Sequence, residues 1–98
     1  MGKIRWTLEA ERWLREIYDY IVRDNPAAAL RTLNGITERA ETLTKFPKRG
    51  YRYQERPEKQ IRILLYGHYR IAYLVNDGGD IDILGVFHGA LDIERYLS

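Results

Sequence analysis

The sequence predicts an α+β domain with an N-terminal strand, an antiparallel helix hairpin, a three-stranded antiparallel meander and a short C-terminal helix. Apolar residues recur at helical spacing on both sides of the tripeptide Asp24-Asn25-Pro26, which ends one helix and begins the next. Further along, three short runs rich in β-branched and aromatic residues fill the stretch 61–88, separated by breaks that contain glycine. Together these patterns predict two helices followed by a sheet.

The first half of the chain begins with a strand candidate at residues 3–6, in which apolar and charged residues alternate. Thr7 then offers a hydroxyl N-cap to the first helix, and Asn25 and Pro26 suit the N-cap and first position of the second. The first apolar stripe consists of Ala10, Trp13, Leu14, Ile17, Tyr20 and Ile21. The second consists of Ala27, Ala28, Ala29, Leu30, Leu33, Ile36, Ala40 and Leu43. Two helices joined this closely predict a tight antiparallel hairpin.

The meander is predicted to turn at Gly67-His68 and again at residues 76–80. Alternation along its strands predicts one face that packs on the helices and one mixed face. The predicted helix-facing residues are Ile61, Ile63, Leu65, Tyr69, Ile71, Tyr73, Val75, Ile81, Ile83 and Phe87. The predicted mixed face carries Arg62, Arg70, Asp82 and His88 among Leu64, Leu74, Leu84 and Val86.

The bulk composition fits a single domain over residues 1–98. The chain has no cysteine, so it has no disulfide, thiol nucleophile or cysteine metal site, which fits a reducing compartment. Its N-terminus lacks the apolar core of a signal peptide, and no apolar run approaches membrane-spanning length. We therefore expect a cytoplasmic protein that does not contact the membrane.

Positive charge is concentrated in residues 45–62, where seven basic side chains stand against two acidic ones. The basic residues are Lys45, Lys48, Arg49, Arg52, Arg56, Lys59 and Arg62. Such a patch suits an anionic partner, either nucleic acid or an acidic protein surface, and equally suits a solvated loop. Arg49, Tyr51, Arg52 and Tyr53 alternate cation and aromatic ring, as in nucleic-acid binders, although the tyrosines can instead pack over the edge of the core.

Few residues are suited to catalysis. His68 lies in a predicted turn, where a solvent-exposed residue is expected, and His88 suits either an acid or base or a hydrogen-bonded structural role. Arg62 and Arg70, expected on one face of adjacent strands, suit a phosphate clamp or ion pairs with Asp82 or with a partner's acids. There is no paired-carboxylate site, phosphate-cradling glycine loop or metal-ligand spacing, so no metal and no cofactor are predicted.

Two segments carry a family resemblance. Gly67-His68-Tyr69-Arg70-Ile71-Ala72-Tyr73 and Val86-Phe87-His88-Gly89-Ala90-Leu91-Asp92 resemble the RelE/ParE superfamily of bacterial type II toxins. The interhelical Asn25-Pro26-Ala27-Ala28 and the closing His-Gly-Ala-x-Asp pattern resemble the ParE-like, plasmid-stabilisation branch, in which Arg often stands at the position of Leu91. The resemblance covers nearly the whole chain.

The resemblance implies a growth-inhibiting toxin that is held inactive by an antitoxin encoded beside it. ParE-like members poison DNA gyrase, whereas RelE-like members cleave mRNA on the ribosome. If the chain is a nuclease, the resemblance implies catalytic roles for Arg70, His88 and Tyr96. The second-strand lysines of the nucleases are absent, and Gly89-Ala90-Leu91 replaces an arginine expected after the last strand. We therefore expect a gyrase inhibitor without catalytic activity of its own, with the ribosome-dependent endoribonuclease as the alternative.

Two binding surfaces are predicted for such a toxin, which would form a hetero-oligomer with its antitoxin. The antitoxin is expected to cover apolar residues of the mixed face and the terminal helix, namely Leu64, Leu74, Leu84, Leu91 and Tyr96. The target, or nucleic acid, is expected to contact the basic segment at Lys48, Arg49, Arg52, Arg56 and Arg62.

Overall fold

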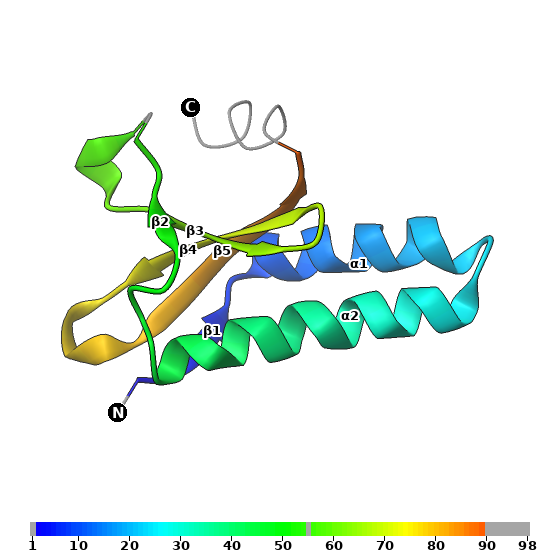
Figure 1. The fold of residues 1–98 in the computed structure, drawn as a ribbon, viewed down its shortest axis with the longest axis horizontal. Helices are drawn as coiled ribbons and strands as arrows, with labels where there is room; N and C mark the ends of the chain where they lie inside the picture. The colour runs from blue at the N-terminus through cyan, green and yellow to red at the C-terminus, as the bar shows by residue number, and fades with distance from the viewer. Residues whose placement is uncertain (1, 55, 90–98) are drawn as a thin grey trace.

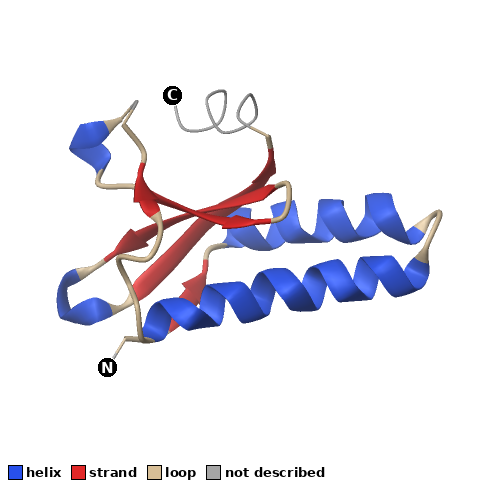
Figure 2. Cartoon of the chain, viewed as in Figure 1, coloured by secondary structure: helices blue, strands red, loops and turns tan. Residues whose placement is uncertain are grey.

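The computed structural model describes residues 2–54 and 56–89. Its helices and strands are β1 (Ile4–Trp6), α1 (Leu8–Val22), α2 (Pro26–Glu41), β2 (Tyr51–Arg52), β3 (Arg62–Tyr66), β4 (Tyr69–Val75) and β5 (Ile81–His88) (Figures 1 and 2). This order confirms the predicted strand, helix hairpin and meander. The predicted C-terminal helix, residues 90–98, lies outside the described residues. None of the described helices combines the length and the apolar character needed to cross a membrane.

Both helices begin at the predicted caps. The Thr7 hydroxyl accepts a hydrogen bond from the Ala10 amide at 3.1 Å, and the Asn25 side-chain oxygen accepts one from the Ala28 amide at 3.0 Å. Pro26 occupies the first turn of α2, where its missing N–H leaves no hydrogen bond unmade. Local sequence therefore fixes where each helix begins.

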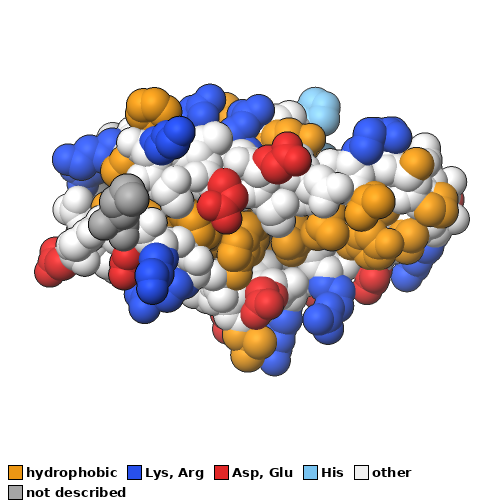
Figure 3. Space-filling view, turned by 90° about the horizontal axis from the view of Figure 1, so that it is seen from below, with side chains coloured by type: hydrophobic (Ala, Val, Ile, Leu, Met, Phe, Trp, Pro, Cys, Tyr) orange, Lys and Arg blue, Asp and Glu red, His pale blue; other side chains and the backbone are white. Residues whose placement is uncertain are grey.

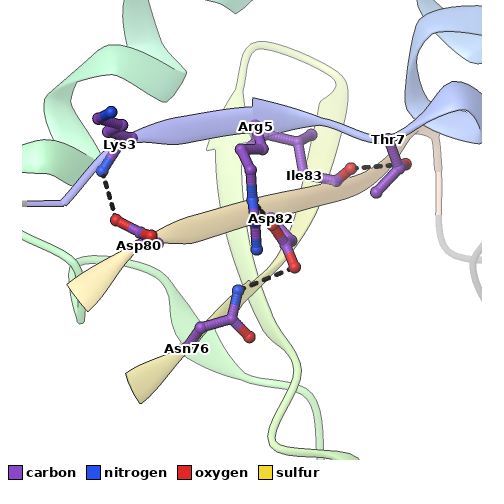
Figure 4. Close-up of polar contacts among 7 residues, drawn as sticks. All are labelled: Lys3, Arg5, Thr7, Asn76, Asp80, Asp82 and Ile83. Carbon is purple, nitrogen blue, oxygen red and sulfur yellow. Dashed lines mark hydrogen bonds and ion pairs between the residues drawn. The ribbon is translucent and has the colours of Figure 1, made fainter. Parts of the chain in front are cut away.

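The sheet has five strands in the order β1-β5-β4-β3-β2. β1 pairs parallel to β5, and the other neighbours are antiparallel. Figure 4 shows the polar contacts that join β1 to β5: the Lys3 amide donates to Asp80 at 2.9 Å, and the Thr7 hydroxyl donates to the Ile83 carbonyl at 2.8 Å. The opposite edge is the two-residue strand β2, which lies inside the segment predicted to be a loop.

The predicted division of residues between the two sheet faces is wrong for β3. Tyr66 and Tyr69 flank the two-residue turn and are register partners, so they share a face. Because side chains alternate along a strand, Leu65 shares its face with Arg70 and not with Tyr69. Leu64 consequently points toward the helices and is 5% exposed, so the predicted exposure of this residue is also wrong.

A bulge in β5 reverses the second half of that strand. Ala72 pairs with Gly85 while Tyr73 pairs with Ile83, so Leu84 is an extra residue in the ladder. Val86 therefore points to the helical side and Phe87 to the other side, opposite to the prediction for both residues.

Both faces of the sheet carry a core. The first core lies under α1 and α2, which cover one face of the sheet (Figure 1), and contains Ala10, Ile36, Ala40, Leu43, Leu64, Ile71, Tyr73, Ile81, Ile83 and Val86. The second, on the outer face, contains Tyr53, Ile61, Ile63, Ala72 and Phe87. Trp13 of α1 joins the second core through an edge-to-face contact with Phe87, with 4.8 Å between ring centroids.

Candidate functional site

The two arginines predicted to clamp a phosphate lie on opposite faces of the sheet. Arg62 is the register partner of Tyr73 on the helical side, whereas Arg70 is the partner of Leu65 and Phe87 on the outer face. The prediction that Arg62 and Arg70 share a face is therefore wrong. The Arg62 Nη1 instead donates to the Gly50 carbonyl at 2.7 Å, which ties β3 to the preceding loop.

Asp82 is engaged by other partners than those predicted. Arg5 Nε donates to Oδ1 of Asp82 at 2.8 Å, and Asn76 Nδ2 donates to Oδ2 at 2.8 Å (Figure 4). The hydrogen bonds from Asn76 and Arg5 hold the pKa of the Asp82 carboxyl below its ordinary value. Arg70 instead lies 3.4 Å from the Tyr51 hydroxyl. Asp82 is thus a structural carboxylate that joins β5 to β1 and to the residue that follows β4.

The two histidines lie together where the β3–β4 turn meets the end of β5. Both are exposed, as predicted for His68, and their ring centroids are 6.0 Å apart. The His88 ring also lies 5.3 Å from that of Tyr69, whose pKa is raised by burial and then by Tyr20. Among the described residues, the His88 side chain contacts two rings and forms no hydrogen bond. Its partner in register is Tyr69, so it points to the helical side, away from Arg70.

An apolar pocket of about 340 Å³ lies between α1 and this end of the sheet. We call it the α1 pocket; its described lining is Trp13, Glu16, Ile17, Tyr20, Ile21, Tyr69, Val86 and His88. It exists because the helix hairpin extends past the sheet (Figure 1), which leaves Tyr20 76% exposed. The sequence assigned Tyr20 and Ile21 to the core stripe of the first helix, since helical spacing does not show where the sheet ends.

The outer side of the hairpin carries a second apolar groove. It has a volume of about 340 Å³ and is lined by Leu14, Tyr18, Leu30 and Leu33, with Glu11 and Arg15 beside them. In Figure 3, hydrophobic side chains form a band along the helical side of the molecule. The hairpin therefore carries exposed apolar surface that was not predicted.

The residues predicted to bind the antitoxin divide into three groups. Leu64 is buried in the first core. Leu74 and Leu84 are half-buried and pack against the second core on the outer face. Leu91 and Tyr96 lie outside the described residues.

The predicted basic surface is also divided. Lys48, Arg49 and Arg52 are exposed, whereas Arg62 is held by backbone carbonyls and Arg56 lies 3.7 Å from Glu58. Tyr53 packs into the second core, as the core alternative predicted, while Tyr51 stays exposed. That these cations bind an anionic partner stays a prediction. In the part of the chain that the structure describes, no group of three His, Asp or Glu residues is placed to hold a metal ion.

Comparison with known proteins decides the family. A family profile described as the ParE toxin of the type II toxin–antitoxin system parDE matches residues 4–93. This chain belongs to the ParE toxin family. The superfamily resemblance read from the sequence is confirmed, and with it the general function of a type II toxin.

Other ParE-like and RelE-like proteins show the same relationship. A putative toxin, Y4kP of Sinorhizobium fredii, is 35% identical over 86 residues, which cover 88% of this chain and 86% of that protein. Among solved structures, the chromosomal ParDE system of P. aeruginosa matches with a TM-score of 0.77 and 28% identity over 92% of this chain and 98% of that one. The RelBE2 toxin–antitoxin complex of Mycobacterium tuberculosis matches with a TM-score of 0.67 and 27% identity over 90% and 98%.

Proposed function

We propose that this ParE-family toxin inhibits growth by poisoning DNA gyrase through a protein-binding surface, without cleaving RNA itself. The observation that supports this proposal is the separation of the two groups that a nuclease would need most. Arg70 shares the outer face with Phe87, whereas His88 shares the helical face with Tyr69. General acid–base catalysis and charge stabilisation require groups that converge on one scissile bond. Side chains that leave neighbouring strands on opposite faces do not converge there.

The proposed target is tested by following both activities in one induced culture. We expect double-strand DNA breaks that disappear in a strain carrying toxin-resistant gyrase, and no new RNA ends within ribosome-bound messages. With purified components, the toxin should increase gyrase-dependent cleavage of plasmid DNA. Ribosome-dependent RNA cleavage by the purified toxin would contradict the proposal and favour the nuclease alternative.

Two variants sharpen this test. Arg70→Ala and His88→Ala should each leave toxicity within a few-fold of the parent, because neither side chain would take part in a chemical step. A nuclease would instead lose on the order of a hundredfold in cleavage rate from either change. Urea unfolding of each variant controls for folding. Loss of RNA cleavage in a folded Arg70→Ala variant would overturn the gyrase assignment.

We also propose that a cognate antitoxin neutralises this toxin. Both structural relatives above come from toxin–antitoxin systems, which supports an antitoxin partner. The proposed contact surface includes Leu74 and Leu84 of the outer face, together with Leu91 and Tyr96. Co-expression with each neighbouring reading frame tests the partner: one of them should co-purify with the toxin and restore growth. Leu74→Asp or Leu84→Asp should weaken that complex, whereas failure of both neighbours to bind would refute the idea.

A further inference from the structure

A cluster of basic side chains lies beside an exposed phenyl ring where the chain leaves the helices. We call residues 45–49 the basic corner: Lys45, Phe46, Pro47, Lys48 and Arg49. They line a shallow hollow of about 740 Å³, and Phe46 is 62% exposed beside it. Within residues 2–54 and 56–89, neither lysine nor Arg49 forms an ion pair, and no acidic residue lines the hollow. In the described part of the chain, the corner therefore offers three positive charges without an acidic partner, next to one apolar ring.

The backbone that carries this corner is held from the core. The Tyr73 hydroxyl, on a side chain with 0% exposure, donates to the Pro47 carbonyl at 2.8 Å and accepts from the Gly50 amide at 2.9 Å. Arg62 Nη1 donates to the Gly50 carbonyl at 2.7 Å. Pro47 and Gly50 of the loop are thus tied to Tyr73 and Arg62 of the sheet, which restrains the backbone of the corner before any ligand binds. A preordered surface loses less conformational entropy when it binds.

We propose that the basic corner binds single-stranded nucleic acid, with a base stacked on Phe46 and phosphates contacted by Lys45, Lys48 and Arg49. Every base offers a flat π-face to an aromatic side chain, and every nucleotide brings a phosphate to nearby cations. A single strand is required because the bases of a duplex are already stacked on one another. Stacking on the Phe46 ring does not distinguish one base from another, because it uses the flat face of the base and not its hydrogen-bonding edge. Binding should therefore tolerate different sequences.

An acidic protein segment fits the corner less well. It would satisfy the three cations, but it would have to supply a separate apolar side chain to an open hollow around Phe46. DNA and RNA strands share the proposed chemistry, so both are tested. Nucleic-acid binding at this corner does not depend on gyrase being the target of the toxin.

The test is fluorescence anisotropy of the full chain with labelled oligonucleotides. The probes are a 12-nucleotide oligothymidine, the matching oligouridine and a 12-base-pair duplex. We expect at least one of the two single-stranded probes to bind more tightly than the duplex. Three phosphate contacts on a single strand predict a slope of about −2 for the logarithm of the affinity against the logarithm of the salt concentration. A duplex that binds as tightly as both strands would overturn the proposal.

Variants at Phe46 separate stacking from charge. Phe46→Ala should weaken strand binding by about tenfold, the range expected when one base loses its stacking partner, whereas Phe46→Tyr should keep most of the affinity. Equal affinity of Phe46→Ala and the parent would show a nonspecific cationic patch and refute the inference.

Paired charge changes provide the matched control. Lys48→Gln with Arg49→Gln should weaken binding and reduce the salt slope by about 1.4, because two phosphate contacts are lost. Arg12→Gln with Arg15→Gln removes the same charge from exposed positions of α1 and should change affinity far less. An equal loss in both pairs would contradict a local site. Tighter binding of a labelled 12-residue polyglutamate than of either strand would assign the corner to an acidic protein instead.

Discussion

Replacing Tyr73 by Phe removes a single oxygen from the centre of the domain and leaves the ring volume in place. That oxygen connects the helix-covered sheet to the loop after α2, because it donates to the Pro47 carbonyl and accepts from the Gly50 amide. Burial raises the pKa of the Tyr73 hydroxyl, so the group stays protonated and able to donate at neutral pH. The substitution therefore asks how much stability depends on this one anchor.

The expected loss follows from the surroundings of the two partners. Gly50 is buried, and its amide has no other hydrogen-bond acceptor among the described residues, so leaving it unpaired costs about 1–3 kcal/mol. Pro47 is half-buried, and its carbonyl can turn toward water, so its lost hydrogen bond costs about 1 kcal/mol. Together these effects predict a decrease of about 2–4 kcal/mol in the free energy of unfolding.

Equilibrium unfolding in urea measures this decrease, which should lower the midpoint by between about 1 and 3 M at slopes typical of small proteins. Tyr69→Phe is the matched control, since it makes the same change in the same strand where the hydroxyl forms no hydrogen bond among the described residues. Tyr73→Phe should also speed hydrogen exchange at the Gly50 amide and weaken the binding of single-stranded nucleic acid at the basic corner. Equal midpoints for the two variants would refute the anchoring role of Tyr73.

Three further changes test other parts of the fold. Ile71→Ala should destabilise the domain by about 2–5 kcal/mol, as expected for a fully buried side chain under the helices, and an unchanged urea midpoint would contradict that placement. Asp82→Asn should cost about 1 kcal/mol at pH 7. The folded-state pKa of Asp82 is lowered, so the carboxylate contributes fully to the free energy of unfolding above its unfolded pKa of about 4. This contribution is lost as the pH falls through the lower folded value. The difference in stability between Asp82→Asn and the parent should therefore shrink at pH 3. A Cβ added at Gly35 would overlap the Tyr66 hydroxyl, so Gly35→Ala should destabilise the parent. In a Tyr66→Ala variant the overlap is gone, and the same change should stabilise the domain by up to about 1 kcal/mol through helix propensity. A change of the same sign in both backgrounds would reject this steric explanation.

Much of the architecture could be predicted because it depends on local signals. Thr7, Asn25 and Pro26 mark helix starts through their own hydrogen bonds or ring geometry, whatever surrounds them. Gly67 and the glycines near residue 78 permit the positive φ angles that the two turns of the meander require. The order of elements, the hairpin and the toxin superfamily were therefore available from the sequence.

The arrangement of side chains around the sheet was decided only in three dimensions. One extra residue at Leu84 and the pairing of Tyr66 with Tyr69 reverse the faces of whole strand segments, because the side-chain period of a strand is two. These reversals buried Leu64 and separated Arg70 from His88.

Long-range partners were equally hidden from the sequence. Nothing local to Asp82 shows that Arg5, 77 residues away, occupies one of its oxygens, or that β1 pairs with β5. The same holds for Tyr73, whose hydroxyl fixes a loop more than twenty residues earlier. Sequence determined which elements form, since their signals lie within a few residues; the sheet determined which functional groups meet, since register depends on contacts between distant segments.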